Sequence, residues 1–175
     1  MHILLAIVSI LGIAMVWYWR AKMAREAAGD VMDAANDVRL AARRFLYKRK
    51  HNTHPADCVE DARLAAAGIA VAVATMDTPI SQAEIKTLTD EMRKTFGIDE
   101  REALDMLSFG RWIAGQCGTN EEAVRRLSKR IAALAGAEAL PDLLQIVERT
   151  ATADGREMDE LEQDALTIIR QTIGH

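Results

Sequence analysis

Four helix-start signals of one type recur between residues 81 and 162, and they constrain the fold more than any other feature of the chain. In each signal a Ser, Thr or Asp is followed three residues later by Glu: Ser81 and Glu84, Asp99 and Glu102, Thr119 and Glu122, and Asp159 and Glu162. In this capping-box pattern the first side chain accepts a hydrogen bond from a backbone N–H, and the Glu reaches back to the start of the helix. Glycines lie near the expected helix ends, at Gly97, Gly118, Gly136 and Gly155. The pattern predicts a body of helices joined by short turns.

Composition supports an all-α fold, because 30 Ala and 16 Leu outnumber the β-branched and aromatic residues that favour strands. We expect a bundle of about six to seven helices over residues 56–175. Six of these are predicted at about residues 56–76, 81–96, 99–116, 120–136, 139–153 and 159–173. The Ala-rich run at residues 64–74 is typical of a buried central helix. Helical spacing assigns further apolar residues to the core, Leu104, Leu134 and Leu161 among them.

Residues 1–19 contain no Asp, Glu, Lys or Arg, and residues 2–19 form an almost uninterrupted apolar run. Eighteen helical residues reach about 27 Å, close to the roughly 30 Å thickness of a bilayer core. Trp17, Tyr18 and Trp19 end the run, and a basic cluster follows at once. These features predict a single-pass membrane anchor, with the N-terminus outside and the body in the cytoplasm. A cleavable signal peptide and a buried core helix are the alternatives, and the order of charge and aromatic residues disfavours both.

Residues 20–50 contain nine Lys or Arg and four Asp or Glu, so this segment carries a charge of +5. It has no Pro, and it predicts that the anchor helix continues into a basic helical arm. Small apolar residues from Ala24 to Phe45 recur at alternating spacings of four and three residues, which is typical of a narrow packing seam. The seam fits parallel self-association or contact with other proteins, and it equally fits packing against the chain's own body.

Residues 51–175 carry 13 Lys or Arg and 22 Asp or Glu, a net charge of −9. We therefore expect no nucleic-acid partner, since the acidic body outweighs the positive charge of the arm. Residues 51–55 form a linker, because Pro55 disfavours helix at the preceding residue. The body shows no phosphate-binding Gly loop, no nucleophile elbow and no HExxH motif. We expect the protein not to be an enzyme.

Two similar acidic turns remain as the candidate functional residues. The first runs from Thr75 to Ile85, and the second from Thr152 to Glu162. Each places an Asp after a helix, then an apolar residue, then a Glu in the first turn of the next helix. The carboxylates are hard oxygen donors suited to Ca²⁺ or Mg²⁺, although neither turn is an EF-hand. The alternative is purely structural, because Glu84 and Glu162 fit a capping role and Asp77 and Asp154 are ordinary turn residues.

This doubled turn in an all-helical body resembles the TerB-like (tellurite-resistance) domain family over about residues 60–174. The resemblance implies an all-α domain whose acidic turns form a divalent-metal site, in bacterial stress systems often found near membranes. With it, the predicted anchor is assigned to the bacterial inner (cytoplasmic) membrane. Carried onto this chain, the family's acidic positions fall on Asp77, Glu84, Asp154 and Glu162, with Asp159 adjacent. Thr78 replaces the usual Gly, and the Asp-to-Glu spacing is seven residues in the first turn and eight in the second.

Two functional hypotheses follow, the first from the resemblance and the second from the seam of the arm and the acidic body. The first is a membrane-anchored TerB-like module that binds a divalent metal in an envelope or tellurite/metal stress response. The second is a metal-free protein-interaction scaffold at the cytoplasmic membrane face.

Overall fold

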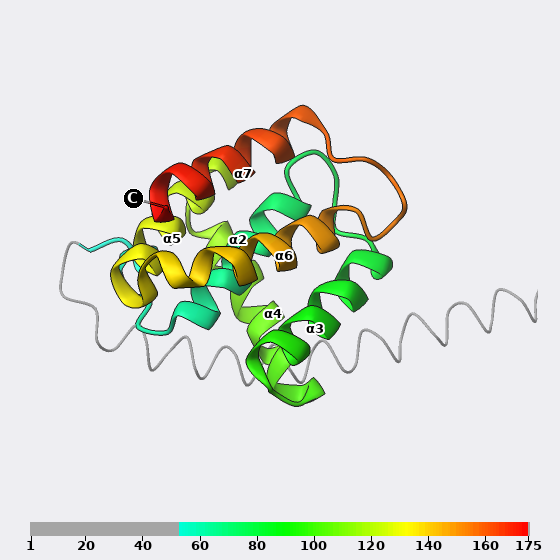
Figure 1. Cartoon of the computed structure of the whole chain (residues 1–175), viewed down its shortest axis with the longest axis horizontal. Coiled ribbons are helices and arrows are strands. Elements are labelled where there is room, and N and C mark those ends of the chain that lie inside the picture. Colours follow the sequence, from blue (N-terminus) through cyan, green and yellow to red (C-terminus); the bar gives the residue numbers. More distant parts are fainter. Residues whose placement is uncertain (1–52, 175) are drawn as a thin grey trace, which may run out of the picture. The chain divides into compact units, whose positions relative to one another are not determined.

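The computed structural model describes residues 53–174, and this part of the chain forms helices and turns without strands (Figure 1). The predicted anchor at 1–19 and the predicted arm at 20–50 lie outside the described residues. The elements are η1 (Pro55–Cys58), α2 (Ala62–Ala74), α3 (Gln82–Phe96), α4 (Glu100–Gly115), α5 (Asn120–Ala135), η2 (Gly136–Ala139), α6 (Leu140–Ala151) and α7 (Glu160–Ile173). The all-α prediction is thus confirmed for the described part.

The first predicted helix, at 56–76, differs from the structure in both position and length. Pro55 opens a short 3₁₀ helix, which is capped by the His54 side chain. The chain then extends before the Asp61 side chain accepts a hydrogen bond from the Arg63 N–H and starts α2. A second helix start therefore interrupts the predicted helix, because a short polar side chain at this position offers the backbone a cap.

Helix α2 lies at the centre of the bundle and packs mainly against α4, α5 and α6. Its residues 65–74 are all buried, which confirms the expectation of a central helix at 64–74. Helix α3 packs against α4 and α6, and α7 packs against α5. Small side chains allow α2 to be covered from several sides, since Ala adds little width to a helix.

Two glycines permit the closest approaches of the bundle. A Cβ at Gly110 of α4 would lie 2.7 Å from the backbone oxygen of Ala67 in α2. A Cβ at Gly68 of α2 would lie 2.7 Å from Cδ1 of Leu127 and 2.8 Å from Cγ2 of Ile113. These separations are shorter than normal carbon contacts, so any larger residue would push the helices apart.

Three leucines that helical spacing assigned to the core are exposed instead. Leu104 is 39% exposed, Leu134 is 37% exposed and Leu161 is 55% exposed. A sequence pattern shows which residues share a helix face, but it does not show whether a neighbouring helix covers each position. The core prediction is wrong at these three sites.

The four predicted capping boxes form in different ways. Both reciprocal bonds are present at the starts of α3 and α7. At α4 and α5 the Asp99 and Thr119 side chains accept the expected backbone N–H. There the Glu side chains pair with arginines instead, Glu102 with Arg63 and Glu122 with Arg126. The two complete boxes belong to the helices that follow the two acidic turns.

Among residues 53–174, the longest apolar helical stretches fall short of what a membrane crossing requires.

A substitution pair on α4 tests the close approach of α2 and α4. We expect Gly110→Ala to lower the free energy of unfolding by about 1–3 kcal/mol or more, because the new methyl group would meet backbone rather than a movable side chain. Gly115→Ala is the matched control, since nothing lies within 4 Å of the position that its methyl group would take. It should change stability by no more than about 0.5–1 kcal/mol, in the stabilising direction. Urea unfolding of both variants gives the comparison, and equal stabilities would contradict the tight contact.

Candidate functional site

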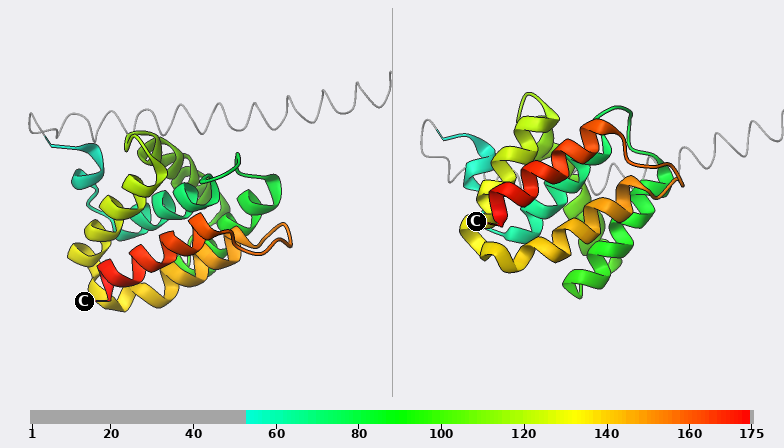
Figure 2. Two further views of the ribbon diagram at one scale, coloured as in Figure 1. Left: turned by 90° about the horizontal axis from the view of Figure 1, so that it is seen from above. Right: turned by 45° about the horizontal axis from the view of Figure 1, so that its top comes forward.

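The two acidic turns lie at the same end of the bundle, although about 75 residues separate them in the sequence (Figure 2). The first turn, residues 75–81, joins α2 to α3, and the second, residues 152–159, joins α6 to α7. Asn120 at the start of α5 holds the first turn, because its Nδ2 donates to the backbone oxygen of Thr75 at 2.7 Å. Packing of α3, α6 and α7 around α2 thus brings the two turns together.

Arg156 lies between the turns and forms ion pairs with four carboxylates. Its Nη1 lies 3.1 Å from Oδ2 of Asp77, and its Nε lies 3.3 Å from Oδ2 of Asp154. Its Nη2 lies 2.8 Å from Oε1 of Glu162 and 3.6 Å from Oε1 of Glu84. We call Asp77, Glu84, Asp154 and Glu162 the turn carboxylates. One guanidinium therefore ties the first turn to the second.

Each buried Glu divides its two oxygens between the helix cap and the guanidinium. Glu84 Oε2 accepts the Ser81 N–H at 2.7 Å, while its Oε1 faces Arg156. Glu162 Oε2 accepts the Asp159 N–H at 3.0 Å, and its Oε1 accepts from Arg156. Capping and participation in a site are therefore compatible, because a carboxylate has two acceptor oxygens.

Four of the five predicted metal ligands thus meet, and Asp159 does not join them. Asp159 Oδ1 accepts the Glu162 N–H at 2.8 Å and serves as the N-cap of α7. Within residues 53–174, no group of three or more His, Cys, Asp or Glu side chains is already spaced to hold a metal ion. The physical reason is that the turn carboxylates are arranged around a planar guanidinium rather than around a point.

Burial and neighbouring charges have opposite effects on the pKa values of Glu162, Asp77 and Arg156. Burial, the largest influence, raises the pKa of Glu162, while the Asp159 N–H and the Arg156 charge oppose the rise. At Asp77 desolvation is again the largest single influence, but Arg156 and local hydrogen bonds outweigh it and lower the pKa. Desolvation opposes the charge of Arg156 too, yet the four carboxylates together raise its pKa. Glu162 is therefore held in a setting that resists its ionisation.

The sequence-based reasoning missed Arg156 as a partner of the site. A signal was present, because Arg156 is the single cation among the acidic residues of the second turn, between Asp154 and Glu162. Sequence does not show that the same side chain also reaches Asp77, which lies 79 residues away.

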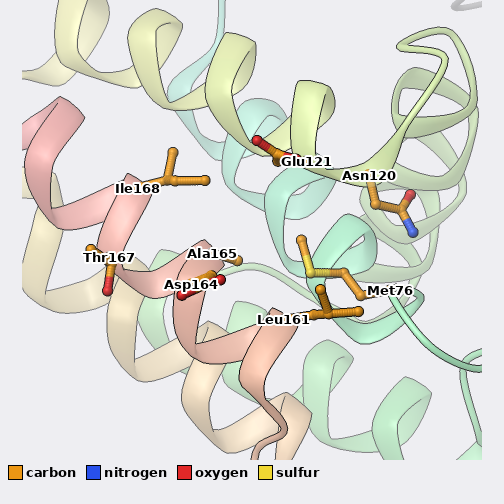
Figure 3. Close-up of a pocket in the computed structure, with 8 residues that line it drawn as sticks. All are labelled: Met76, Asn120, Glu121, Leu161, Asp164, Ala165, Thr167 and Ile168. Atoms are coloured by element: carbon orange, nitrogen blue, oxygen red, sulfur yellow. The ribbon is translucent and has the colours of Figure 1, made fainter.

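A cavity of about 480 Å³ opens between the first acidic turn, α5 and α7 (Figure 3). Met76 and Leu161, the chain neighbours of Asp77 and Glu162, face each other at one end of it. The remaining lining comes from α5 and α7, with the residues Asn120, Glu121, Asp164, Ala165, Thr167 and Ile168. The lining combines apolar side chains with the acidic Glu121 and Asp164, and it includes none of the turn carboxylates.

The comparison with protein families agrees with this architecture. The family described as Tellurite resistance protein TerB matches residues 63–175. This match covers more than half of the chain, so the chain belongs to the TerB family, which confirms the resemblance derived from the doubled turns. Comparisons with curated proteins and with solved structures found no match.

The raised pKa of Glu162 predicts a pH effect that Glu162→Gln should abolish. The folded state binds a proton at Glu162 more tightly than the unfolded state, so this group stabilises the fold at low pH. That contribution is lost as the pH rises through the folded-state pKa. Lowering the pH from 7 towards about 4.3, the ordinary pKa of Glu, should therefore stabilise the wild type relative to Glu162→Gln. Each unit of pKa difference is worth about 1.4 kcal/mol.

Urea unfolding of both proteins at several pH values in this window measures the difference. Asp77 also makes the stability of the fold depend on pH, but its pKa is lowered. The stability that its ionised form contributes is therefore lost at more acidic pH, and this loss does not mask the effect of Glu162. A stability difference that stays constant across the window would contradict the burial argument.

Proposed function

We propose that this protein is a non-enzymatic TerB-family module that binds a divalent cation, Ca²⁺ or Mg²⁺, through the turn carboxylates. The observation that supports the proposal is the convergence of Asp77, Glu84, Asp154 and Glu162 from two distant turns onto one cationic centre. We further propose that the module acts in a bacterial envelope or tellurite/metal stress response, as its family membership suggests.

The donor set suits a hard divalent cation. Carboxylate oxygens are the ligands that Ca²⁺ and Mg²⁺ prefer, and Ca²⁺ accepts six to eight oxygens in flexible geometry. Oε1 of Glu84 is buried without a hydrogen-bond donor, and the Glu84 side chain is only 2% exposed. Such an oxygen is costly unless a cation compensates it. A bound ion would supply that positive charge and link the two turns.

The proposed role includes attachment to the cytoplasmic face of the inner membrane. The uncharged run at 1–19, the aromatic residues at its end and the basic arm at 20–50 support it. A domain held there would sense divalent ions close to the membrane. Other proteins, or a second copy of the chain, would bind through the arm.

Arg156 favours a second candidate function, a metal-free interaction scaffold. Its ion pairs with Asp77 and Glu162 already link the two turns without a metal. In this case the turn carboxylates stabilise the bundle, and the arm or the acidic surface of residues 51–175 binds partners. Metal titration distinguishes the two functions.

We expect millimolar Ca²⁺, Mg²⁺ or Mn²⁺ to raise the unfolding temperature of the wild type, because a ligand that binds the folded state stabilises it. The stabilisation reaches about 2.7 kcal/mol when the free ion is 100-fold above Kd. Asp77→Asn with Asp154→Asn should remove most of this effect while leaving both complete capping boxes in place.

The matched control is Asp90→Asn with Glu148→Gln, which removes two carboxylates of exposed ion pairs elsewhere. Its response to metal should equal that of the wild type. Absence of a shift in the wild type with all three ions would exclude the metal-binding function and leave the scaffold.

Deletion of residues 2–19 tests the anchor. The 175-residue chain should sediment with membranes and resist extraction by high salt, because its attachment is apolar. The deletion variant should move to the soluble fraction. A control that replaces Arg39, Arg43 and Arg44 with Gln should stay membrane-bound, and release of this control by salt would indicate an electrostatic attachment instead.

A further inference from the structure

We propose that Arg156 is a built-in competitor of the metal: its guanidinium and a divalent cation occupy the same place, so the metal binds only when Arg156 withdraws. The inference rests on the proposed metal-binding function and concerns how that site is regulated. It makes Arg156 the residue that sets the affinity of the site.

Geometry supports competition for a single place. The ion pairs that the structure gives the turn carboxylates all run to Arg156, with nitrogen–oxygen distances of 2.8–3.6 Å. A cation that contacts the same oxygens from both turns would overlap the guanidinium. The Arg156 side chain remains 29% exposed, so it can leave towards solvent without opening the core.

The guanidinium does not donate a hydrogen bond to every turn carboxylate. A metal ion would therefore make a contact that Arg156 does not make. Arg is planar and donates in a fixed fork. Nη2 donates to Glu162 Oε1 at 2.8 Å, and it stays 3.6 Å from Glu84 Oε1, which receives no hydrogen bond. A spherical ion has no preferred plane and can approach oxygens from several directions.

The negative charge of the turn carboxylates also favours a divalent ion over the singly charged Arg156. Four carboxylates face one guanidinium, which leaves three negative charges uncompensated if all four are ionised. Exchange of Arg156 for a divalent ion reduces this excess to two.

When Arg156 occupies the place between the turn carboxylates, the apparent affinity of the site for metal is lowered. When only a fraction of molecules has the competent conformation, the apparent Kd rises by the inverse of that fraction. Removal of Arg156 abolishes this competition, and it also leaves the carboxylates without a counter-ion. The same substitution should therefore weaken the metal-free fold and strengthen metal binding, which a merely structural arginine would not do.

The test compares Arg156→Gln with the wild type in the 175-residue chain, purified in mild detergent. Arg170→Gln is the matched control, because Arg170 also forms an ion pair, with Glu148, which is not one of the turn carboxylates. Thermal unfolding in EDTA measures the metal-free fold, and titration with Ca²⁺ and Mn²⁺ measures affinity. We expect Arg156→Gln to unfold at a lower temperature in EDTA and to bind metal about tenfold more tightly or better. Arg170→Gln should match the wild type in affinity.

Two further variants keep the inference testable if Arg156→Gln does not fold without metal. Arg156→Lys keeps the charge but loses the fork, so its metal affinity should lie between those of the wild type and Arg156→Gln. Adding Glu84→Gln to Arg156→Gln removes one repelling charge and should restore part of the metal-free stability.

The outcomes separate this inference from the proposed function. If the wild type binds metal and Arg156→Gln binds it equally or more weakly, the competition is refuted and the metal-binding function stands. If only Arg156→Gln binds metal, Arg156 excludes the ion, and the wild type is not a metal-binding module. If neither binds, both proposals fail.

Discussion

The burial of α2 on several sides is the constraint on which the rest of the structure depends. Residues 65–74 are all buried, and the helix is narrow enough for α4 and α5 to approach closely. Gly110 and Gly68 make the closest contacts possible. Helix α2 ends at Ala74, and the first acidic turn follows at once. Asn120 of α5 fixes the start of this turn by donating a hydrogen bond to the backbone oxygen of Thr75.

The acidic turns show how helix capping and a polar site share the same side chains. Glu84 and Glu162 each use one oxygen for the cap and turn the other towards Arg156. The capping bond holds each carboxylate in a fixed position, so the site is organised by local helix chemistry. This arrangement explains why two of the four capping signals join the cluster around Arg156, while the Glu residues at the starts of α4 and α5 pair with other arginines.

Membership of the TerB family and the geometry of the turns support each other. The family match covers residues 63–175, which includes both turns and nearly all of the helical body that positions them. The turn carboxylates meet around a cation, as expected of a site that binds positive charge, and here that cation is a side chain of the chain itself.

The helical class, the presence of two similar acidic turns and the central position of α2 could all be predicted from the sequence. The reason is that helix capping and hydrophobic periodicity are local properties. Sequence patterns misplaced the exposed Leu104, Leu134 and Leu161, since their burial depends on which helix lies opposite. Only the tertiary structure decided that Asp77 and Asp154 meet, that Asp159 stays with its cap, and that Arg156 holds the centre. The physical reason is that ion pairing across 79 residues follows from helix packing, which no local pattern encodes.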